Sequence, residues 1–512
     1  MRLKLRLKGP LRWAGNTSSL LKYYHEVIKA LNYEPRKGIE DTLRWLEQGE
    51  NVVLTAPTGY GKTTLTKVLG KAASKGNNLF DKVIHVLPYR AIVQDLYLRL
   101  LAEKEKLEIE SVGAQDMDYH DAPYYLKKVN ITTLDSFVLN LFKVPVDEFA
   151  KVIKGNGSHF EVPRGMIYSS LIIFDEFHLF AEEGKAITST LASIDALIDG
   201  GVPLLVMTAT LPKCLAKELK QRGFNFAEAN DFNVKREIKV ECVDDPYSAL
   251  EKGVKKTLMV FNTREEAIKA YQKVKKMGFN PLLIHSKFNS ADRKKKVEEI
   301  LKVSRGESNY DVVIATQVIE AGIDVSFDLL ITEACPADSL IQRAGRVARY
   351  GGKGTVKIFP FRGKVYDSQE VKATMSKLMK TKRIDSSLLD VLKRGVNVDK
   401  PLQKSLEAIE SILFGPEATK SLFKVECSLT REVSLIPGYP PGCNDPSCAV
   451  PLTEEEARKL LPGKVITYDG QEIEYSTSKK ECLQVSFLIN GIEGVRIPGY
   501  DEEIGAILVR EK

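Results

Sequence analysis

Two groups of residues, nearly three hundred positions apart, have the types and spacing that bind phosphate. In the first, TGYGKT at 58–63, two glycines precede a lysine and a threonine. Such glycines let backbone amides surround a phosphate, the lysine reaches the β- and γ-phosphates, and the hydroxyl binds Mg²⁺. In the second, QRAGRVAR at 342–349, three arginines follow a glutamine at intervals of three residues. Arginine is always charged and its forked donors suit phosphate or carboxylate, so the sequence predicts two anion sites.

The first group is predicted to be a phosphate loop between a strand, NVVLTA at 51–56, and a helix that begins near Thr63. The strict pattern G-x-x-x-x-G-K-[ST] has a glycine where Ala56 stands, and an ordinary glycine turn is the alternative. The flanking strand and helix favour a nucleotide, because the helix N-terminus attracts an anion. We expect ATP to contact Ala56, Pro57, Thr58, Gly59, Tyr60, Gly61, Lys62, Thr63 and Thr64.

Two carboxylates stand at the end of a buried strand in LIIFDEFHLF, at 171–180. We expect Asp175, together with Thr63, to hold Mg²⁺, and Glu176 to accept a proton from the attacking water. An acidic pair after a strand is common by itself, so this assignment depends on the phosphate loop upstream. His178 either couples the nucleotide to a later strand end or caps its own strand. The coupling residues are then His178, Thr208, Ala209 and Thr210.

The three arginines are predicted on one broad face of a helix that begins near Ser339. Arg346 and Arg349 are expected to bind the γ-phosphate as arginine fingers, with Gln342 orienting a water. Arg343 is expected to brace the motif on an acidic neighbour. A solvated basic helix face is the alternative, but no acidic residue stands four positions on to pair them. The preceding strand-end motif, 315–328, adds two expected ATP contacts, Gly322 and Asp324.

Short β-rich runs alternate with amphipathic helices twice, over about 52–210 and 257–361. This rhythm is typical of parallel sheets covered by helices. The fold class is therefore predicted as α/β, with two tandem parallel-sheet lobes at 1–235 and 236–364. An accessory domain, 365–512, is predicted to be helical over 369–395 and 402–414 and mixed after that.

The charge is unevenly distributed along the 512 residues. The net charge is +7, yet residues 401–512 carry 12 basic and 18 acidic side chains, so the front of the chain is the part suited to a polyanion. No apolar run approaches the roughly 20 residues of a membrane helix, and we expect a cytoplasmic protein without a membrane partner. The seven cysteines are scattered and predict isolated thiols, with a Cys443–Cys448 disulfide as the next option.

Loops at predicted strand ends offer hydroxyls, amides and cations that suit the backbone of single-stranded nucleic acid. Each is an ordinary loop residue when taken alone. The basic segment 371–395 is a further candidate, with a solvated helix face as the alternative. The expected contacts are Pro88, Arg90, Thr133, Asp135, His285, Ser286, Thr316 and Gln317.

In this order, over about residues 50–352, the motifs resemble those of superfamily 2 helicases. The helicase subunit of type I CRISPR interference is the most similar family. The segments that carry the resemblance are LPYRAIVQ, TTLDSF, DEFH, IHSKFNSADR, IEAGIDVSFD and QRAGRVARYG. The resemblance implies that the two lobes are RecA-like. It also implies ATP- and Mg²⁺-dependent translocation along single-stranded DNA, 3′ to 5′. It also implies recruitment by an RNA-guided surveillance complex.

Three departures from that family bear on function. An HD-type nuclease often precedes the helicase, whereas the HD pair here, His120 and Asp121, lies inside the first lobe, so we expect a separate nuclease subunit. The segment EPRKGIEDTL at 34–43 contains no glutamine to read adenine, and Ala348 replaces a frequent asparagine. An RNA helicase or RNA-remodelling ATPase is the alternative function, and a docking subunit of a protein–RNA complex is another.

Overall fold

The computed structural model describes most of the chain. The described residues are 19–57, 59–116, 121–148, 151–152, 159–181, 184–232, 236–250, 256–320, 323–363, 365–392, 395–411, 427–431, 435–477 and 482–508. Thr58 and Gly322 of the expected nucleotide site lie outside them. The chain divides into two compact units, with unit 1 comprising Met1–Asn233, Gly395–Leu422 and Leu429–Glu432, and unit 2 comprising Val234–Arg394, Phe423–Ser428 and Val433–Lys512. The segment expected as one accessory domain is thus shared between both units.

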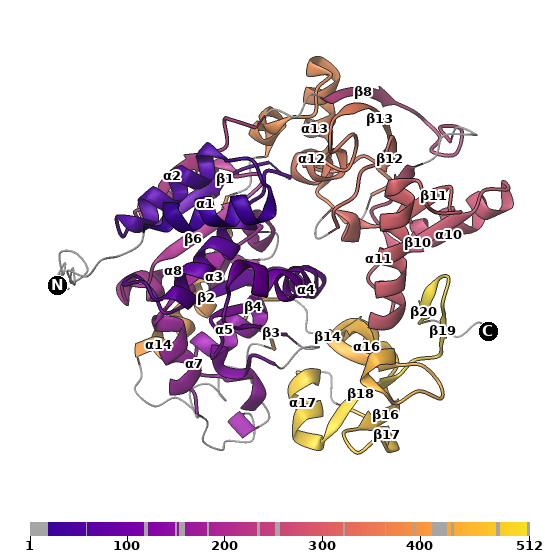
Figure 1. Ribbon diagram of the computed structural model, residues 1–512. Helices are drawn as coiled ribbons and strands as arrows, with labels where there is room; N and C mark the ends of the chain where they lie inside the picture. Colours follow the sequence, from indigo (N-terminus) through magenta and orange to yellow (C-terminus); the bar gives the residue numbers. More distant parts are fainter. Residues whose placement is uncertain are drawn as a thin grey trace. The chain divides into compact units, whose positions relative to one another are not determined.

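Unit 1 is built on a parallel seven-stranded sheet with the order β3-β4-β2-β5-β6-β1-β7 (Figure 1). Its strands are β1 (Val52–Thr55), β2 (Lys82–Leu87), β3 (Val112–Gln115), β4 (Val129–Thr133), β5 (Ser170–Phe174), β6 (Leu204–Thr208) and β7 (Asn225–Glu228). The central strands read as continuous apolar runs because helices cover both faces of a parallel sheet. Each of β4, β5 and β6 is buried along its whole length.

The helices of unit 1 come from two parts of the chain. They include α1 (Leu20–Leu31), α2 (Lys37–Glu47), α3 (Thr64–Lys75), α4 (Arg90–Leu107), α5 (Leu134–Leu141), α7 (Glu161–Tyr168), α8 (Gly184–Asp199), α9 (Lys213–Gln221) and α14 (Lys400–Ser411). Helix α14, although distant in sequence, is part of unit 1. The Arg164 guanidinium donates two hydrogen bonds to the Glu410 carboxylate of this helix, at 2.8 and 2.9 Å. The Lys143 ammonium also donates to the Ile409 carbonyl at 2.6 Å.

Unit 2 begins with a parallel six-stranded sheet of order β10-β11-β9-β12-β13-β8. Its strands are β8 (Arg236–Cys242), β9 (Thr257–Val260), β10 (Pro281–Ile284), β11 (Val312–Ala315), β12 (Leu329–Glu333) and β13 (Gly352–Phe359). Its helices include α10 (Arg264–Lys276), α11 (Ser290–Arg305), α12 (Ala337–Ala344) and α13 (Ser368–Thr381). The two parallel-sheet lobes predicted from the sequence are confirmed.

A small mixed module, 435–508, completes unit 2 and is coloured orange to yellow in Figure 1. A five-stranded sheet, ordered β15-β14-β18-β16-β17, contains β14 (Leu435–Tyr439), β15 (Val450–Thr453), β16 (Gly463–Thr467), β17 (Glu472–Tyr475) and β18 (Ile492–Arg496). Two helices, α16 (Glu454–Lys459) and α17 (Leu483–Asn490), pack on it, and a hairpin follows, β19 (Gly499–Asp501) and β20 (Gly505–Ile507). The Lys287 ammonium ties this module to the lobe by contacting the Pro451 carbonyl at 2.7 Å and Glu456 at 2.5 Å.

Three local expectations differ from the structure. Cys443 and Cys448 are joined in a disulfide rather than isolated, because a tight turn brings their Cα atoms to 6.6 Å. The helix expected over 369–395 ends at Thr381, since Lys382 adopts a left-handed φ of 53°. The arginine helix α12 ends at Ala344, so Arg346 and Arg349 lie in the irregular segment beyond it and do not continue a helical face.

Candidate nucleotide site and helicase motifs

The predicted ATP residues of unit 1 gather at one edge of its sheet. The phosphate loop follows β1, the acidic pair follows β5, and the TAT segment begins at the end of β6. These strands are neighbours in the order β5-β6-β1 and run parallel, so their carboxyl ends share an edge. Ligands of parallel α/β sheets bind at that edge.

The loop after β1 has the backbone of a phosphate cradle. Gly59 and Gly61 adopt φ values of 88° and 95°, the left-handed region that favours glycine. Lys62 is buried, and its ammonium donates to the Ala56 carbonyl at 3.2 Å. Ala56 itself is fully buried without a positive φ, so this position does not require the glycine of the strict pattern.

Asp175 is a buried carboxylate held in its charged form. Burial alone would raise its pKa, but contact with His85 and the charge of Lys62 hold the pKa below its ordinary value. The His85 Nε2 lies 3.3 Å from Asp175, and its Nδ1 lies 2.8 Å from the Thr66 hydroxyl. The ionised Asp175 carboxylate and the Thr63 hydroxyl both offer hard oxygen donors, and such donors fit Mg²⁺. Sequence reasoning missed His85, because nothing in β2 marks it as a neighbour of β5.

Glu176 has a strained backbone and an available carboxylate oxygen. Its φ is 51°, a conformation that costs a non-glycine residue about 1–3 kcal/mol and concentrates at functional sites. Its amide donates to the Asp175 carboxylate at 2.8 Å, which orients the two acidic residues relative to each other. Its Oε2 is buried and accepts no hydrogen bond from the described residues. This geometry suits a general base.

His178 contacts the strand end that the sequence suggested. Its Nδ1 lies 2.9 Å from the Thr208 hydroxyl and 3.7 Å from the Glu176 carboxylate. The Thr208 hydroxyl donates to the Thr210 carbonyl at 2.6 Å, while Ala209 between them is half-buried. A continuous polar chain therefore joins the acidic pair to the TAT segment.

Aromatic and cationic side chains lie beside the phosphate loop, and one of them, Arg36, comes from the segment 34–43 that lacks the adenine-reading glutamine. The Tyr60 hydroxyl accepts from the Gly38 amide at 2.8 Å and donates to Asp231 at 2.6 Å. The Arg36 guanidinium lies over the Phe232 ring at 4.8 Å. Phe232 also approaches Gly59, where an added Cβ would stand 3.9 Å from its ring. The sequence did not indicate this group, because Asp231 and Phe232 are about 170 residues from Tyr60.

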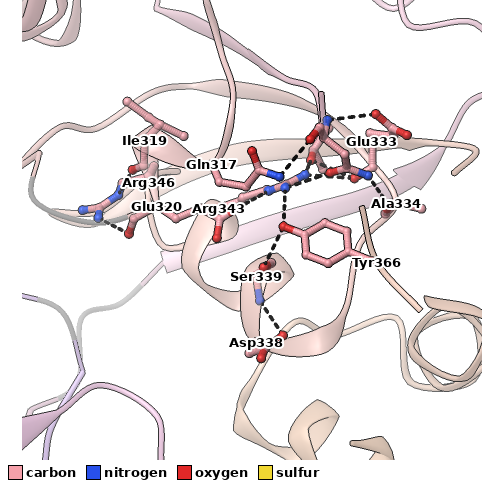
Figure 2. Close-up of polar contacts among 12 residues, drawn as sticks. Gln317, Ile319, Glu320, Glu333, Ala334, Asp338, Ser339, Arg343, Arg346 and Tyr366 are labelled. Carbon is pink, nitrogen blue, oxygen red and sulfur yellow. Dashed lines mark hydrogen bonds and ion pairs between the residues drawn. The ribbon is translucent and has the colours of Figure 1, made fainter. Parts of the chain in front are cut away.

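In unit 2, Arg343 braces the motif internally (Figure 2). The side chain is fully buried, and its Nε contacts Glu320 at 2.7 Å. Its other nitrogens donate to the Thr332 hydroxyl and the Asn262 amide oxygen, each at 2.9 Å. Burial raises the pKa of Glu320 even with this partner. Gln342, on the same helix, is also buried.

Arg346 and Arg349 have different surroundings. The buried Arg346 guanidinium donates to the carbonyls of Ile319, at 3.0 Å, and Glu320, at 2.6 Å (Figure 2). Arg349 pairs with Asp324 at 2.7 Å, and its Nη1 makes no hydrogen bond with the described residues. Glu320 and Asp324, which precede the helix in sequence, thus supply acidic partners to two of the three arginines. Asp324, expected at the nucleotide, is an ion-pair partner within unit 2.

The expected nucleic-acid contacts separate into internal and accessible residues. His285 is 1% exposed, its Nε2 donates to the Ile504 carbonyl at 3.0 Å, and its Nδ1 accepts from the Lys287 amide. Thr133 and Thr316 are buried too, and Asp135 pairs with Arg431. In the structure, the side chains of His285, Thr133, Thr316 and Asp135 are therefore buried or make internal contacts. The remaining four, which are exposed or half-buried, are Pro88, Arg90, Ser286 and Gln317.

Comparison with known proteins agrees with this order of motifs. Residues 37–218 match the DEAD/DEAH box helicase family, and residues 253–352 match the C-terminal region of CRISPR-associated nuclease/helicase Cas3. The CRISPR-associated helicase Cas3 of Thermoproteus tenax is 28% identical over 350 residues, covering 65% of this chain and 60% of that protein. The CRISPR-associated nuclease/helicase Cas3 of Methanothermobacter thermautotrophicus is 28% identical, covering 67% and 44%. The chain therefore spans 44% to 60% of the length of these two relatives.

Solved structures support the fold. T. fusca Cas3 with ADP superposes with a TM-score of 0.64 at 15% identity, covering 96% of this chain and 70% of that one. The DUF1998 helicase MrfA bound to DNA gives 0.60 at 15% identity, covering 92% and 72%. None of the helices in the described part of the chain combines the length and apolar composition of a bilayer crossing. Both lobes thus match helicase family models in the expected order, and the chain is similar to CRISPR-associated helicases of the Cas3 type.

Proposed function

We propose that this chain is an ATP-driven translocase that moves 3′ to 5′ along single-stranded DNA and unwinds target DNA in CRISPR interference. The observation that carries the proposal is the convergence of Lys62, Asp175 and Glu176 at one sheet edge, with the aspartate ionised and a glutamate oxygen available. A lysine, a metal-binding carboxylate and a base are the parts that hydrolysis of a nucleoside triphosphate requires.

The residues of unit 1 have distinct tasks in that reaction. Lys62 neutralises the β- and γ-phosphates, and Gly59 and Gly61 shape the backbone around them. Asp175 and Thr63 would hold Mg²⁺, which neutralises phosphate charge when it is bound. Glu176 orients the attacking water and takes its proton. The chain from Glu176 through His178 to Thr208 then carries the change at the nucleotide toward the TAT segment.

Arginines of unit 2 complete the charge balance in this proposal. Arg343 is committed to Glu320 and is a positioning residue, whereas Arg346 and Arg349 are the candidate fingers. An arginine finger contributes roughly 10³–10⁵ in rate. The unsatisfied Nη1 of Arg349 supports its assignment, because a buried donor without an acceptor suits a phosphate oxygen.

DNA as the track is supported by the relatives. The family match is to Cas3, and the MrfA structure holds DNA. Pro88, Arg90, Ser286 and Gln317 are the side chains we assign to the strand, and ATP-dependent movement would change their grip. The same similarity supports our proposal that an RNA-guided surveillance complex recruits the chain in the cytoplasm.

We also propose that a separate HD-type nuclease cuts the unwound strand. Three of the six histidines, His85, His178 and His285, are committed to internal contacts. Asp121 of the HD pair accepts from the Ala114 amide at 2.8 Å and from the Tyr97 hydroxyl, so it acts as a structural cap.

The decisive experiment measures ATP hydrolysis by the full chain with single-stranded DNA, with RNA of the same sequence and with neither. We expect DNA to stimulate turnover and RNA to have little effect, with Glu176→Gln as the inactive control. Displacement of a labelled strand from duplexes with a 3′ or a 5′ overhang then reports direction, and we expect unwinding of the 3′ form. Stimulation by RNA alone would assign the chain to RNA remodelling instead.

A further inference from the structure

Two cysteines and a glutamate that are distant in sequence meet in unit 2, where Cys427 lies beside the C-terminal module, 435–508. The sulfurs of Cys427 and Cys482 and a carboxylate oxygen of Glu454 all lie within 4.8 Å of one another. Neither sulfur is in a disulfide, although Cys443 and Cys448 of the same module are joined. Separations of nearly 30 residues between successive members hide this group from any motif search.

We propose that Cys427, Glu454 and Cys482 bind a thiophilic divalent cation, of which Zn²⁺ is the best match, with water as the fourth ligand. Zinc takes thiolate and carboxylate ligands at about 2.0–2.3 Å in a tetrahedron, so its ligand atoms stand nearly 4 Å apart. The observed separations need only a small contraction to reach that arrangement. Two soft sulfurs select against Mg²⁺ and Ca²⁺, which prefer oxygen.

The carboxylate is held in place by neighbours, as the ligands of a metal site usually are. Arg458 donates to its Oε1 from two nitrogens, at 3.0 and 2.6 Å, and the Leu483 amide donates to the same oxygen at 3.2 Å. Among the described residues, every hydrogen bond to Glu454 therefore ends on Oε1, which makes Oε2 the natural ligand oxygen. Arg458 also balances charge, because two thiolates and one carboxylate carry one negative charge more than Zn²⁺ neutralises.

The position of Cys482 supports an anionic sulfur. Cys482 is the residue before the first turn of α17, where the positive end of the helix favours a thiolate. The three ligands come from separate elements, namely the segment at 427, the start of α16 and the start of α17. A bound cation would therefore cross-link three parts of a module whose own apolar core is small. Small domains commonly use such a tie to supplement a limited core.

The test measures metal content and cobalt spectroscopy on the full chain. Protein purified with reductant and with added ZnSO₄ is freed of loose metal and assayed for zinc, and we expect about one zinc per chain. Replacement by Co²⁺ should produce sulfur-to-cobalt charge transfer in the near ultraviolet and the visible bands of a tetrahedral ion. Cys427→Ser and Cys482→Ser should lose most of both signals. Glu454→Gln removes a charged ligand and should weaken cobalt binding by at least the roughly 10–100-fold that loss of a group supporting a ligand causes.

Cys242→Ser is the matched control, because Cys242 is an exposed cysteine of the same unit outside the cluster. It should keep full zinc content and the full cobalt spectrum. To separate loss of metal from misfolding, the circular dichroism and ATP hydrolysis of each cysteine variant are compared with those of wild type. Zinc retained in the cysteine variants, absence of cobalt–sulfur absorption in wild type, or a Cys427–Cys482 disulfide that forms under reducing conditions would each overturn the proposal.

Discussion

Replacing Arg343 tests whether this arginine is structural, in contrast to the candidate fingers Arg346 and Arg349. The side chain is fully buried, and Arg343→Met would leave the buried Glu320 without its ion-pair partner. It would also remove the donors to Thr332 and Asn262. Breaking a buried pair by removing one partner costs about 3–5 kcal/mol.

That cost converts into a measurable change in melting temperature. Unit 2 has roughly 250 residues, and 1 kcal/mol shifts the midpoint of a domain of that size by about 2–4 °C. The melting temperature of unit 2 should therefore fall by about 6–20 °C, as measured by calorimetry or circular dichroism. A second change, Glu320→Gln, removes the uncompensated charge and should restore part of the loss.

Arg362→Met is the control for the loss of an ordinary ion pair in the same unit. Arg362 contacts Glu266 at 2.9 Å, but its side chain is 43% exposed. Exposed pairs contribute about 0–1 kcal/mol, so the midpoint should fall by no more than about 4 °C. If Arg343→Met were no more damaging than this control, or if Glu320→Gln failed to relieve it, Arg343 would not be a structural brace.

Four further variants address the nucleotide site and the acid sensitivity of unit 2. Lys62→Ala should abolish binding of a fluorescent ATP analogue, because the phosphates lose their cation; tight binding by the variant would remove Lys62 from the site. Glu176→Gln should bind ATP normally but hydrolyse it about 10²–10⁴-fold more slowly in a phosphate-release assay, and near-normal turnover would exclude it as the base. Arg349→Ala should spare binding and lose about 10³–10⁵ in rate if it is a finger, whereas loss of binding alone would refute that role. Burial lowers the pKa of His285 from 6.5 to about 3. Between these pH values the unfolded chain binds a proton that the folded chain does not. The free energy of unfolding therefore falls by about 1.4 kcal/mol for each pH unit of acidification. His285→Asn should weaken the fall in melting temperature between pH 6.5 and 5, whereas exposed His25→Asn should not; equal pH profiles would contradict the assignment.

The structure also changes how the C-terminal region can be studied. Removing residues 401–512 would take α14 away from unit 1 and the module around Lys287 away from unit 2. It would also uncover His285, whose Nε2 donates to the carbonyl of Ile504. Loss of activity after such a truncation would therefore report damage to both lobes and would not identify a docking surface.

The parts that the sequence predicted well are those whose signals are local. The phosphate loop is a strand, a turn and a helix within about 25 residues, and the acidic pair adjoins its own strand. Parallel pairing then brings such strand ends to one edge, so the pattern of apolar runs was enough to predict both lobes, and it places the residues of the predicted ATP site together. Gly59, Lys62, Asp175 and Glu176 needed no long-range information.

Other features depended on segments that meet only in the folded chain. The sequence marked QRAGRVAR as an anion site, but the fold decides that Arg343 faces Glu320 while Arg346 and Arg349 leave the helix. His285 looked like a loop residue until a hairpin more than two hundred positions later covered it. Cys427 and Cys482 looked isolated until α17 came beside the segment at 427. Local sequence sets the chemistry that each side chain can offer, whereas burial and partners are set by long-range packing, which no short pattern records.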